Sequence, residues 1–277
     1  MKKLKNKLLL LVLCCMGCTI LYAQQAIPLE SDPQKITDIK AYIERIDRQL
    51  TVSPDSGALY IKKSSLQMAL GDYVAARANV TQAIQLNPDP NALFFLYYRR
   101  GDLNARLGNP NEAYEDFSKS IELQPKYEWA YLDRGMILSD NGMYQQAEAD
   151  FRSALAIRPQ WGDAYYCLGL NIQDQGDTRQ AMAYYEQAIP YMDAESIFHE
   201  NTYNNMGQLY MEQKKYKEAV QQFDQATRVN PAYALAIVNR ASAKYQLGDK
   251  AGACADLHRA LELGRVEMKS EYEKYCN

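Results

Sequence analysis

Residues that could act as acids, bases, nucleophiles or metal ligands are few in this sequence, and they are scattered. The chain of 277 residues has two histidines, His199 and His258, and neither has a partner at a spacing typical of a metal site. Acidic pairs such as Glu148 and Asp150 fall in segments whose charged residues should face solvent. The sequence contains no glycine-rich phosphate loop and no nucleophile elbow. It therefore predicts a protein that is not an enzyme and that holds no metal or cofactor.

Cysteine is the remaining reactive residue type. Three cysteines lie close to the N-terminus and three lie further along, namely Cys14, Cys15, Cys18, Cys167, Cys254 and Cys276. A cysteine can form a disulfide in an oxidising compartment, carry a lipid in an exported protein, or simply pack as a small apolar residue. Which of these applies depends on the helices and the targeting segment that hold each one.

A 34-residue repeat defines those helices. Gly108, Gly142 and Gly176 are each 34 residues apart, and Lys214 takes the same position 34 residues before Gly248. Other residue types recur at fixed distances from this glycine position. In most units an aromatic residue lies eleven residues before it. A small residue lies seven residues before it, and a bulky apolar residue lies nine residues after it. Small residues let two helices approach closely while bulky ones fill the space beside them. Glycine suits the left-handed residue that ends a helix. An alanine also recurs five residues later, at Ala76, Ala113, Ala147, Ala181, Ala219 and Ala253.

This pattern resembles the tetratricopeptide repeat (TPR) family, whose unit is a helix–turn–helix of 34 residues. The resemblance covers residues 57–265 and implies an all-α, right-handed superhelical solenoid. It also implies a scaffold or adaptor that binds a protein or peptide. The six units are 57–90, 94–127, 128–161, 162–195, 200–233 and 234–265.

Two intervals are longer than the repeat. The interval from Gly71 to Gly108 is 37 residues, and the interval from Gly176 to Lys214 is 38 residues. Insertions between units usually form loops. We therefore expect loops around residues 88–91 and 190–199.

In the resembling family, the second, fifth, ninth and twelfth residues of each unit line a concave groove. Carried over to this sequence, these positions are aromatic and methionine-rich at first and amide-rich in the fifth unit, as in surfaces that bind peptides. The alternative is that Phe95, Trp129 and Leu132 are core residues between helices. The resemblance implies a partner-binding groove at Phe95, Tyr98, Trp129, Met136, Tyr166, Leu170, Asn201, Asn204, Gln208 and Tyr245.

The N-terminus has the organisation of an export signal. Residues 1–7 are basic, and the apolar stretch at 8–21 is too short for a comfortable membrane span. We expect a signal peptide at 1–23, cleaved after Ala23. The mature chain would then be periplasmic or envelope-associated and have no transmembrane segment.

Two alternatives to this cleavage stay open. Cys18 follows the small residue Gly17, as in a lipoprotein signal, although the leucine expected three residues ahead of it is absent. Lipid attached to Cys18 would anchor the protein. An uncleaved N-terminal anchor is the other alternative.

Capping helices are predicted on both sides of the repeats. Residues 24–56 contain a polar lead-in and then a helix at 34–51, with Asp32 as its cap. Residues 266–277 form a short, highly charged C-terminal capping helix. Terminal elements of a repeat array are expected to be atypical in this way.

The C-terminal cap brings two cysteines into reach of each other. Cys254 begins the second helix of the last unit, and Cys276 ends a capping helix that should run antiparallel to it. An oxidising compartment would allow a disulfide between them. Cys167 is expected to be a buried, unreactive residue.

Charge argues against one class of partner. The chain has 31 basic and 34 acidic residues, and loss of residues 1–23 removes four lysines, which leaves a net charge of −7. Binding to nucleic acid requires a basic face, so a nucleic-acid partner is not expected.

The sequence predicts a non-catalytic adaptor of the bacterial cell envelope. The alternatives are a lipid-anchored structural or assembly component of an outer-membrane-associated complex, and an unrecognised enzyme or carbohydrate-binding protein.

The interpretations of the N-terminus predict different mature proteins. Signal cleavage gives a chain that starts at Gln24 or its pyroglutamate form, whereas lipoprotein processing gives an acylated Cys18. Mass spectrometry of the protein purified from its native envelope separates these masses, and we expect Gln24. A chain that still starts at Met1 would contradict both and would support the uncleaved anchor.

Overall fold

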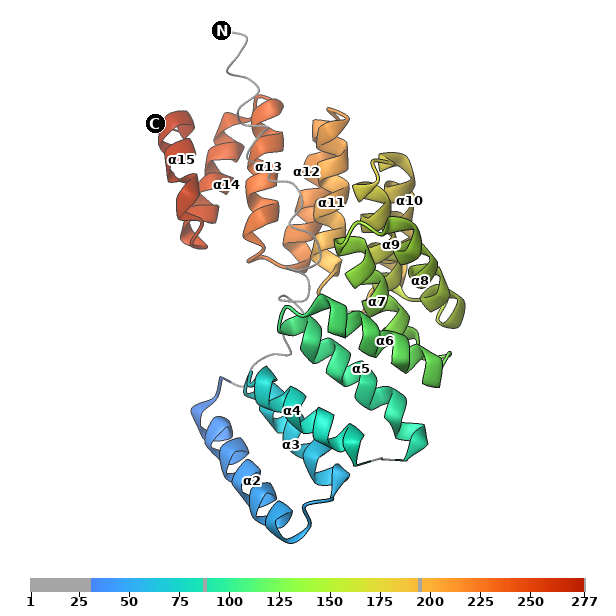
Figure 1. Cartoon of the computed structure of the whole chain (residues 1–277). Coiled ribbons are helices and arrows are strands. Elements are labelled where there is room, and N and C mark those ends of the chain that lie inside the picture. The colour runs from blue at the N-terminus through green and yellow to red at the C-terminus, as the bar shows by residue number, and fades with distance from the viewer. Residues whose placement is uncertain (1–30, 87–88, 194–195, 277) are drawn as a thin grey trace. The chain divides into compact units, whose positions relative to one another are not determined.

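The computed structural model describes residues 31–86, 89–193 and 196–276, and every regular element in these ranges is a helix (Figure 1). The predicted signal peptide and Cys18 lie outside the described residues. The chain divides into two compact parts after Pro159. The described residues of the first, 31–159, are called the N-terminal half below, and those of the second, from 160 on, the C-terminal half.

The N-terminal half has a capping helix followed by three helix pairs. The cap is α2 (Pro33–Val52), and the Asp32 carboxylate accepts the N–H groups of Gln34 and Lys35 at its start. Consecutive helices pack against each other, both within a pair and from one pair to the next. The pairs are α3 (Gly57–Ala69) with α4 (Tyr73–Gln85), α5 (Pro90–Arg106) with α6 (Pro110–Leu123), and α7 (Glu128–Asp140) with α8 (Tyr144–Ile157).

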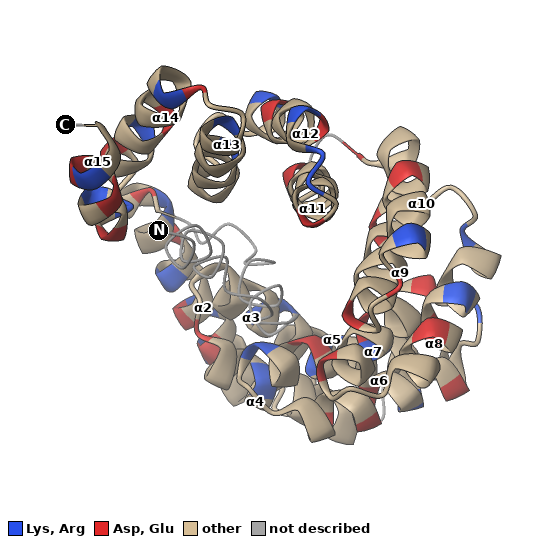
Figure 2. Cartoon of the chain, turned by 90° about the horizontal axis from the view of Figure 1, so that it is seen from above, with Lys and Arg blue, Asp and Glu red and all other residues tan. Residues whose placement is uncertain are grey.

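The C-terminal half has three further helix pairs and ends with a short cap. A 3-10 turn, η1 (Ile189–Tyr191), extends α10, and a second, η2 (Val266–Met268), leads into α15 (Lys269–Cys276). Basic and acidic residues are interspersed along the helices of both halves (Figure 2). The pairs are α9 (Gly162–Asp174) with α10 (Thr178–Ala188), α11 (His199–Glu212) with α12 (Tyr216–Val229), and α13 (Ala234–Gln246) with α14 (Lys250–Glu262).

A glycine facing an aromatic ring sets how closely the helices of a pair approach. A Cβ added to Gly135 would lie 2.7 Å from the ring of Phe151, which is closer than real Cβ atoms come, and that ring is buried. Only glycine therefore fits without a shift of the helices. Four pairs of residues meet in this way, namely Gly101–Phe117, Gly135–Phe151, Gly169–Tyr185 and Gly207–Phe223.

A bidentate ion pair also joins the two helices of some pairs. Arg134 donates from Nε and Nη2 to the two carboxylate oxygens of Asp150, both at 2.8 Å, and Asp150 is buried. The same arrangement joins Arg100 to Asp116 and Arg240 to Asp256, again 16 residues apart. These pairs satisfy buried carboxylates that would be costly if left unpaired.

The turn between paired helices follows the repeat closely. Its glycines have φ between 73° and 88°, and Lys214, which replaces glycine, has φ of 59°. Asp72, Asp177 and Asp249 then cap the next helix with their side chains, whereas Asn109 makes no such bond. The left-handed position is thus kept even where the residue is a lysine.

The first insertion differs from the loop that the sequence predicts. Residues 87–88 lie outside the described residues, but Pro90 and Asn91 already belong to α5. The Asp89 carboxylate accepts the N–H of Asn91 at 2.9 Å, and a proline at the first helical position needs no acceptor. The prediction of a loop was therefore wrong for these residues, because local capping starts the helix early.

The second insertion packs back on the start of α9. A Cβ added to Gly162 would lie 2.7 Å from the backbone N of Met192, so this glycine permits the close approach. The Ser196 hydroxyl donates to the Asp163 carboxylate at 2.5 Å. Residues 194–195 lie outside the described residues, and the segment on either side of them is held against the first helix of its own unit.

Substituting Gly135 by alanine should show what the close approach contributes. We expect Gly135→Ala to lower the free energy of unfolding by about 1–3 kcal/mol, because the new methyl group overlaps the Phe151 ring. Gly57→Ala is the matched control. It makes the same change at the first residue of α3, where the nearest atom would lie 3.9 Å away, so stability should change by less than about 1 kcal/mol. Denaturant unfolding followed by circular dichroism measures both. Equal effects would contradict the packing argument.

Candidate functional site

A pocket of about 310 Å³ lies at the C-terminal end of the C-terminal half. Helices α11, α13 and α14 form three sides of it, and η2 with α15 forms the fourth. Its wall is mainly apolar. The larger apolar side chains that line it are Leu235, Val238, Tyr245, Leu257, Met268 and Tyr275.

The last helix pair, α13 with α14, lacks the glycine–aromatic contact that packs the two helices together in four of the earlier pairs. At the corresponding positions it has Ala241 and Leu257, and both line the pocket. A leucine fills less space beside the opposing helix than a phenylalanine ring does. The pocket therefore lies where the repeat departs from its own packing rule.

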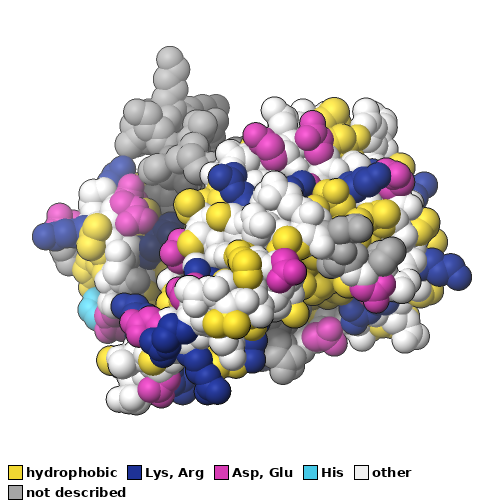
Figure 3. Space-filling view, turned by 60° about the horizontal axis from the view of Figure 1, so that its bottom comes forward, with side chains coloured by type: hydrophobic (Ala, Val, Ile, Leu, Met, Phe, Trp, Pro, Cys, Tyr) yellow, Lys and Arg dark blue, Asp and Glu magenta, His cyan; other side chains and the backbone are white. Residues whose placement is uncertain are grey.

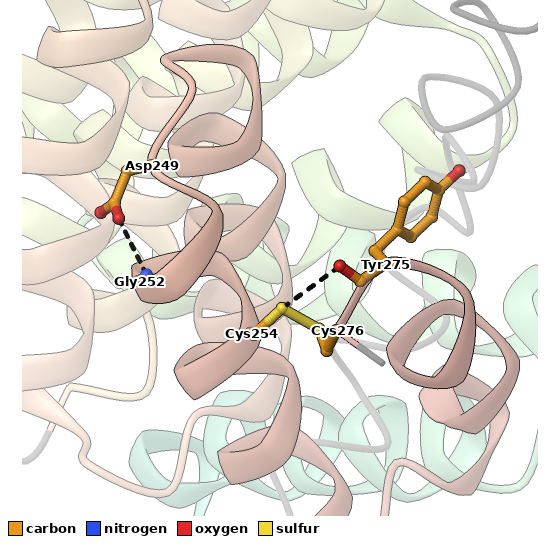
Figure 4. Close-up of a disulfide and its surroundings, with 5 residues drawn as sticks. All are labelled: Asp249, Gly252, Cys254, Tyr275 and Cys276. Atoms are coloured by element: carbon orange, nitrogen blue, oxygen red, sulfur yellow. Dashed lines mark hydrogen bonds between the residues drawn. A yellow bond between two sulfur atoms is a disulfide. The ribbon is translucent and has the colours of Figure 1, made fainter.

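The disulfide between Cys254 and Cys276 attaches α15 to α14 (Figure 4). Cys254 itself lines the pocket, and the Tyr275 carbonyl lies 3.7 Å from its Sγ. Helix α15 has no fully buried residue, so packing alone holds it weakly. A disulfide that spans 22 residues contributes about 3 kcal/mol by restricting the unfolded chain. The position of α15 thus depends strongly on this bond.

Several polar groups on the pocket wall are available to a ligand. The side chains of Gln208 and Ser242 make no hydrogen bond with any other described residue. Glu271 accepts the Ser270 hydroxyl at 2.8 Å and forms no ion pair in the part of the chain that the structure describes. Polar groups of this kind fix the orientation of what an apolar pocket binds.

The other charges of the pocket neutralise each other. Arg265 Nε lies 2.7 Å from Glu267 Oε1, an ion pair that lacks the alignment of a hydrogen bond. One carboxylate of the pocket, that of Glu271, therefore has no ion-pair partner among the described residues. The pocket thus combines a mainly apolar wall with a carboxylate that forms no ion pair among the described residues.

Family models for the tetratricopeptide repeat match this chain along most of its repeat region. Five of them match, at residues 58–90, 94–127, 117–149, 162–232 and 204–266. The chain belongs to the tetratricopeptide repeat family. The matched residues fall on the helix pairs described above, and in α7–α8 the match ends within α8.

Solved TPR structures have the same fold. A TPR protein from Parabacteroides merdae matches with a TM-score of 0.67 at 18% identity, over 94% of this chain and 99% of that one. Pseudomonas aeruginosa PilF matches with a TM-score of 0.65 at 16% identity, over 79% and 97%. YrrB, described as a TPR protein with an unusual peptide-binding site, matches with a TM-score of 0.51 at 21% identity, over 70% and 97%. At these identities the likeness concerns the fold alone.

Two groove residues predicted from TPR positions line the pocket. They are Gln208 and Tyr245, and the ring of Tyr245 lies 5.0 Å from that of Tyr275, centroid to centroid. Leu170 is half-buried in the same half of the chain. The cap also lines the pocket, through residues that include Met268, and the high charge of this segment gave no sign of that role.

Two other predicted groove residues of the C-terminal half are buried. Tyr166 lies under Phe198, with ring centroids 4.8 Å apart, because the second insertion brings that phenylalanine over it. Asn204 accepts a hydrogen bond from Asn239 at 2.9 Å. As placed in this structure, neither residue lines an open surface, which corrects the prediction.

Asn201, also predicted for the groove, is engaged at both ends of its amide. It donates to the Ile197 carbonyl at 2.9 Å and accepts the Tyr233 hydroxyl at 2.5 Å. Burial raises the pKa of Tyr233, so this hydroxyl stays protonated and donates. The amide therefore ties the start of α11 to the next unit, and its role here is structural.

The predicted residues of the N-terminal half gather around an aromatic cluster. Phe95 is 39% exposed and stacks on Tyr98 at 6.2 Å, and Tyr98 meets the edge of Tyr127 at 5.0 Å. Trp129 is half-buried, whereas Met136 has no exposed surface and does not line an open groove as placed here. Hydrophobic side chains also reach the surface between charged ones on the face in Figure 3. The sequence did not single out Tyr127.

A buried carboxyl group lies beneath this cluster. Burial and the nearby carboxylate of Asp102 raise the pKa of Asp133 to about 7, against the opposing effects of a hydrogen bond from Tyr98 and of Arg106. Asp102 itself accepts a hydrogen bond from Arg106 Nε at 2.9 Å. Asp133 is therefore a buried acid whose charge changes near neutral pH.

Two features are absent from the ranges that the structure describes. Within them, no three or more His, Cys, Asp or Glu side chains gather in a way that could hold a metal ion. None of the helices in those ranges combines the length and the apolar character needed to cross a membrane.

The raised pKa of Asp133 predicts how stability varies with pH. An unfolded aspartate loses its proton near pH 4 and the folded one near pH 7, so the free energy of unfolding should fall as pH rises between these values. The fall should reach at most about 4 kcal/mol. Asp133→Asn should remove this dependence, whereas exposed Asp55→Asn should keep it. Urea unfolding at pH 4, 5.5 and 7 measures the difference, and parallel curves for the two variants would contradict it.

Proposed function

We propose that this protein is a non-catalytic adaptor that holds a peptide or a segment of another protein in its C-terminal pocket. The observation that carries the proposal is the pocket itself, which is apolar and has side chains with unused hydrogen-bonding groups at Gln208 and Ser242. Apolar pockets with a few convergent polar groups are common binding sites. The TPR fold supports a protein or peptide as the partner.

The exposed aromatic ring of Phe95 and its neighbours provide a second, smaller contact in the N-terminal half. Aromatic side chains carry much of the energy of protein interfaces because they bury a large area with little loss of entropy. The adaptor would thus contact partners through both halves, with the C-terminal pocket as the more specific site.

The proposal places the adaptor in the bacterial cell envelope. The basic and apolar N-terminal residues 1–21 support export. The disulfide between Cys254 and Cys276 supports an oxidising compartment. A lipid-anchored assembly component of an outer-membrane-associated complex is the second candidate, favoured by the small residue that precedes Cys18.

Site-specific photocrosslinking in the native cell tests the adaptor function. A benzophenone amino acid at Tyr245 replaces one aromatic residue by another inside the pocket, and the same amino acid at the exposed Gln221 of α12 is the control. We expect irradiation to give a discrete adduct with another protein from position 245 and none from position 221. Mass spectrometry then identifies the partner. An absent adduct at 245, or equal adducts at both positions, would contradict the proposal.

A further inference from the structure

We propose that the C-terminal pocket selects a peptide segment in which an aliphatic side chain stands next to a lysine or arginine, and that α15 forms the selecting wall. This inference rests on the proposed function and adds the chemistry of the partner. It follows from the apolar lining, the available hydrogen-bonding groups, the single unpaired charge and the attachment of α15.

The apolar part of the pocket suits an aliphatic side chain. Leu235, Val238 and Leu257 offer aliphatic surface from two helices, and Met268 closes it from η2. Methionine is flexible and adapts to side chains of different shape. The ring of Tyr275 completes the wall. An aliphatic residue of about the size of leucine gains most by leaving water here.

Two polar groups suit the backbone of an extended peptide. The amide of Gln208 on α11 can both donate and accept, and the hydroxyl of Ser242 on α13 can do the same. Because neither side chain is bonded to another described residue, each can bond to a peptide C=O or N–H without breaking a contact of the protein. They would hold the peptide backbone while its side chain enters the apolar part.

The charge of the pocket favours a cation beside that side chain. Arg265 is paired with Glu267, so the carboxylate of Glu271 remains for a ligand. The whole chain is acidic as well, with 34 acidic against 31 basic residues. A lysine or arginine would form a charge-assisted hydrogen bond with Glu271, whereas an acidic residue would be repelled.

The wall formed by α15 keeps its position because a disulfide links this helix to α14. Glu271 and Tyr275 both lie on α15, which buries no residue fully and is tied to α14 by the bond between Cys254 and Cys276. Without this bond an eight-residue helix has little to keep it in place. Loss of the disulfide should therefore remove both the charge and one apolar side from the pocket.

Three fluorescein-labelled heptapeptides that differ only in their central dipeptide test the selectivity. The dipeptides are Leu-Lys, Leu-Glu and Ser-Lys, and fluorescence anisotropy with the purified full chain gives the dissociation constants. We expect the Leu-Lys peptide to bind about tenfold or more tightly than the other two. Equal binding of Leu-Lys and Leu-Glu would overturn the proposal, as would equal binding of Leu-Lys and Ser-Lys.

Two variants on the same helix assign the effect to Glu271. Glu271→Gln should weaken the Leu-Lys peptide about tenfold and leave the Leu-Glu peptide no weaker. Glu273→Gln makes the same charge change on α15 at an exposed residue that does not line the pocket, and it should have no effect. Unchanged Leu-Lys binding in Glu271→Gln would overturn the assignment.

The double variant Cys254→Ser and Cys276→Ser tests the role of the disulfide. It should lose the preference for the Leu-Lys peptide while its far-ultraviolet circular dichroism stays close to that of the parent protein. Retained preference would overturn the role given to α15. A crosslink at Tyr245 without selectivity for Leu-Lys would leave the adaptor function standing and contradict the partner chemistry, whereas loss of the crosslink contradicts the function itself.

Discussion

Close packing of paired helices is the constraint on which the rest of the described structure depends, and in four of its six pairs a glycine that faces an aromatic ring sets the distance. The ring of Phe151 fills the space that a side chain at position 135 would need. With the helices this close, Arg134 reaches both oxygens of the buried Asp150 carboxylate. Every helix pair keeps a left-handed residue at its turn, including the last pair, where alanine replaces the glycine of the contact. The ion pair between Arg240 and Asp256 forms in that pair as well, so the turn and the ion pair accompany close packing and do not require the glycine itself.

The candidate site lies where this contact is replaced. In the last pair, Ala241 and Leu257 occupy the positions of glycine and ring, and both face the pocket. No further helix pair follows in the described chain, so the space is closed by a short cap instead. That cap brings a carboxylate and a tyrosine into the wall, and a disulfide fixes it. The pocket proposed as the binding site therefore coincides with a departure from the repeat.

Much of the fold could be predicted from the sequence, because the repeat encodes contacts between residues at fixed separation. Glycine, alanine and aromatic positions recur in register, and so do the helix ends that they determine. The approach of Cys254 to Cys276 could also be expected, since it needs only the direction of two adjacent helices.

The site could be predicted less well, because groove positions carried over from a family assume regular neighbours. Tyr166 is buried because the irregular second insertion adds Phe198 above it. Asn204 is engaged by Asn239, a residue outside the groove positions of its unit. The contribution of Glu271 arises from how the cap folds back, which no repeat position describes. These features depend on segments that occur once in the chain.

The role of the disulfide-held cap is tested most directly by hydrogen exchange of α15, followed by mass spectrometry, in the oxidised protein and after reduction with a phosphine. Reduction should speed exchange in α15 by tenfold or more while α11 and α13 keep their protection. The Leu-Lys peptide should slow exchange in α13 and α15 of the oxidised protein alone. Equal protection of α15 before and after reduction, or peptide protection that persists after reduction, would contradict the claim that the disulfide-held cap forms the binding site.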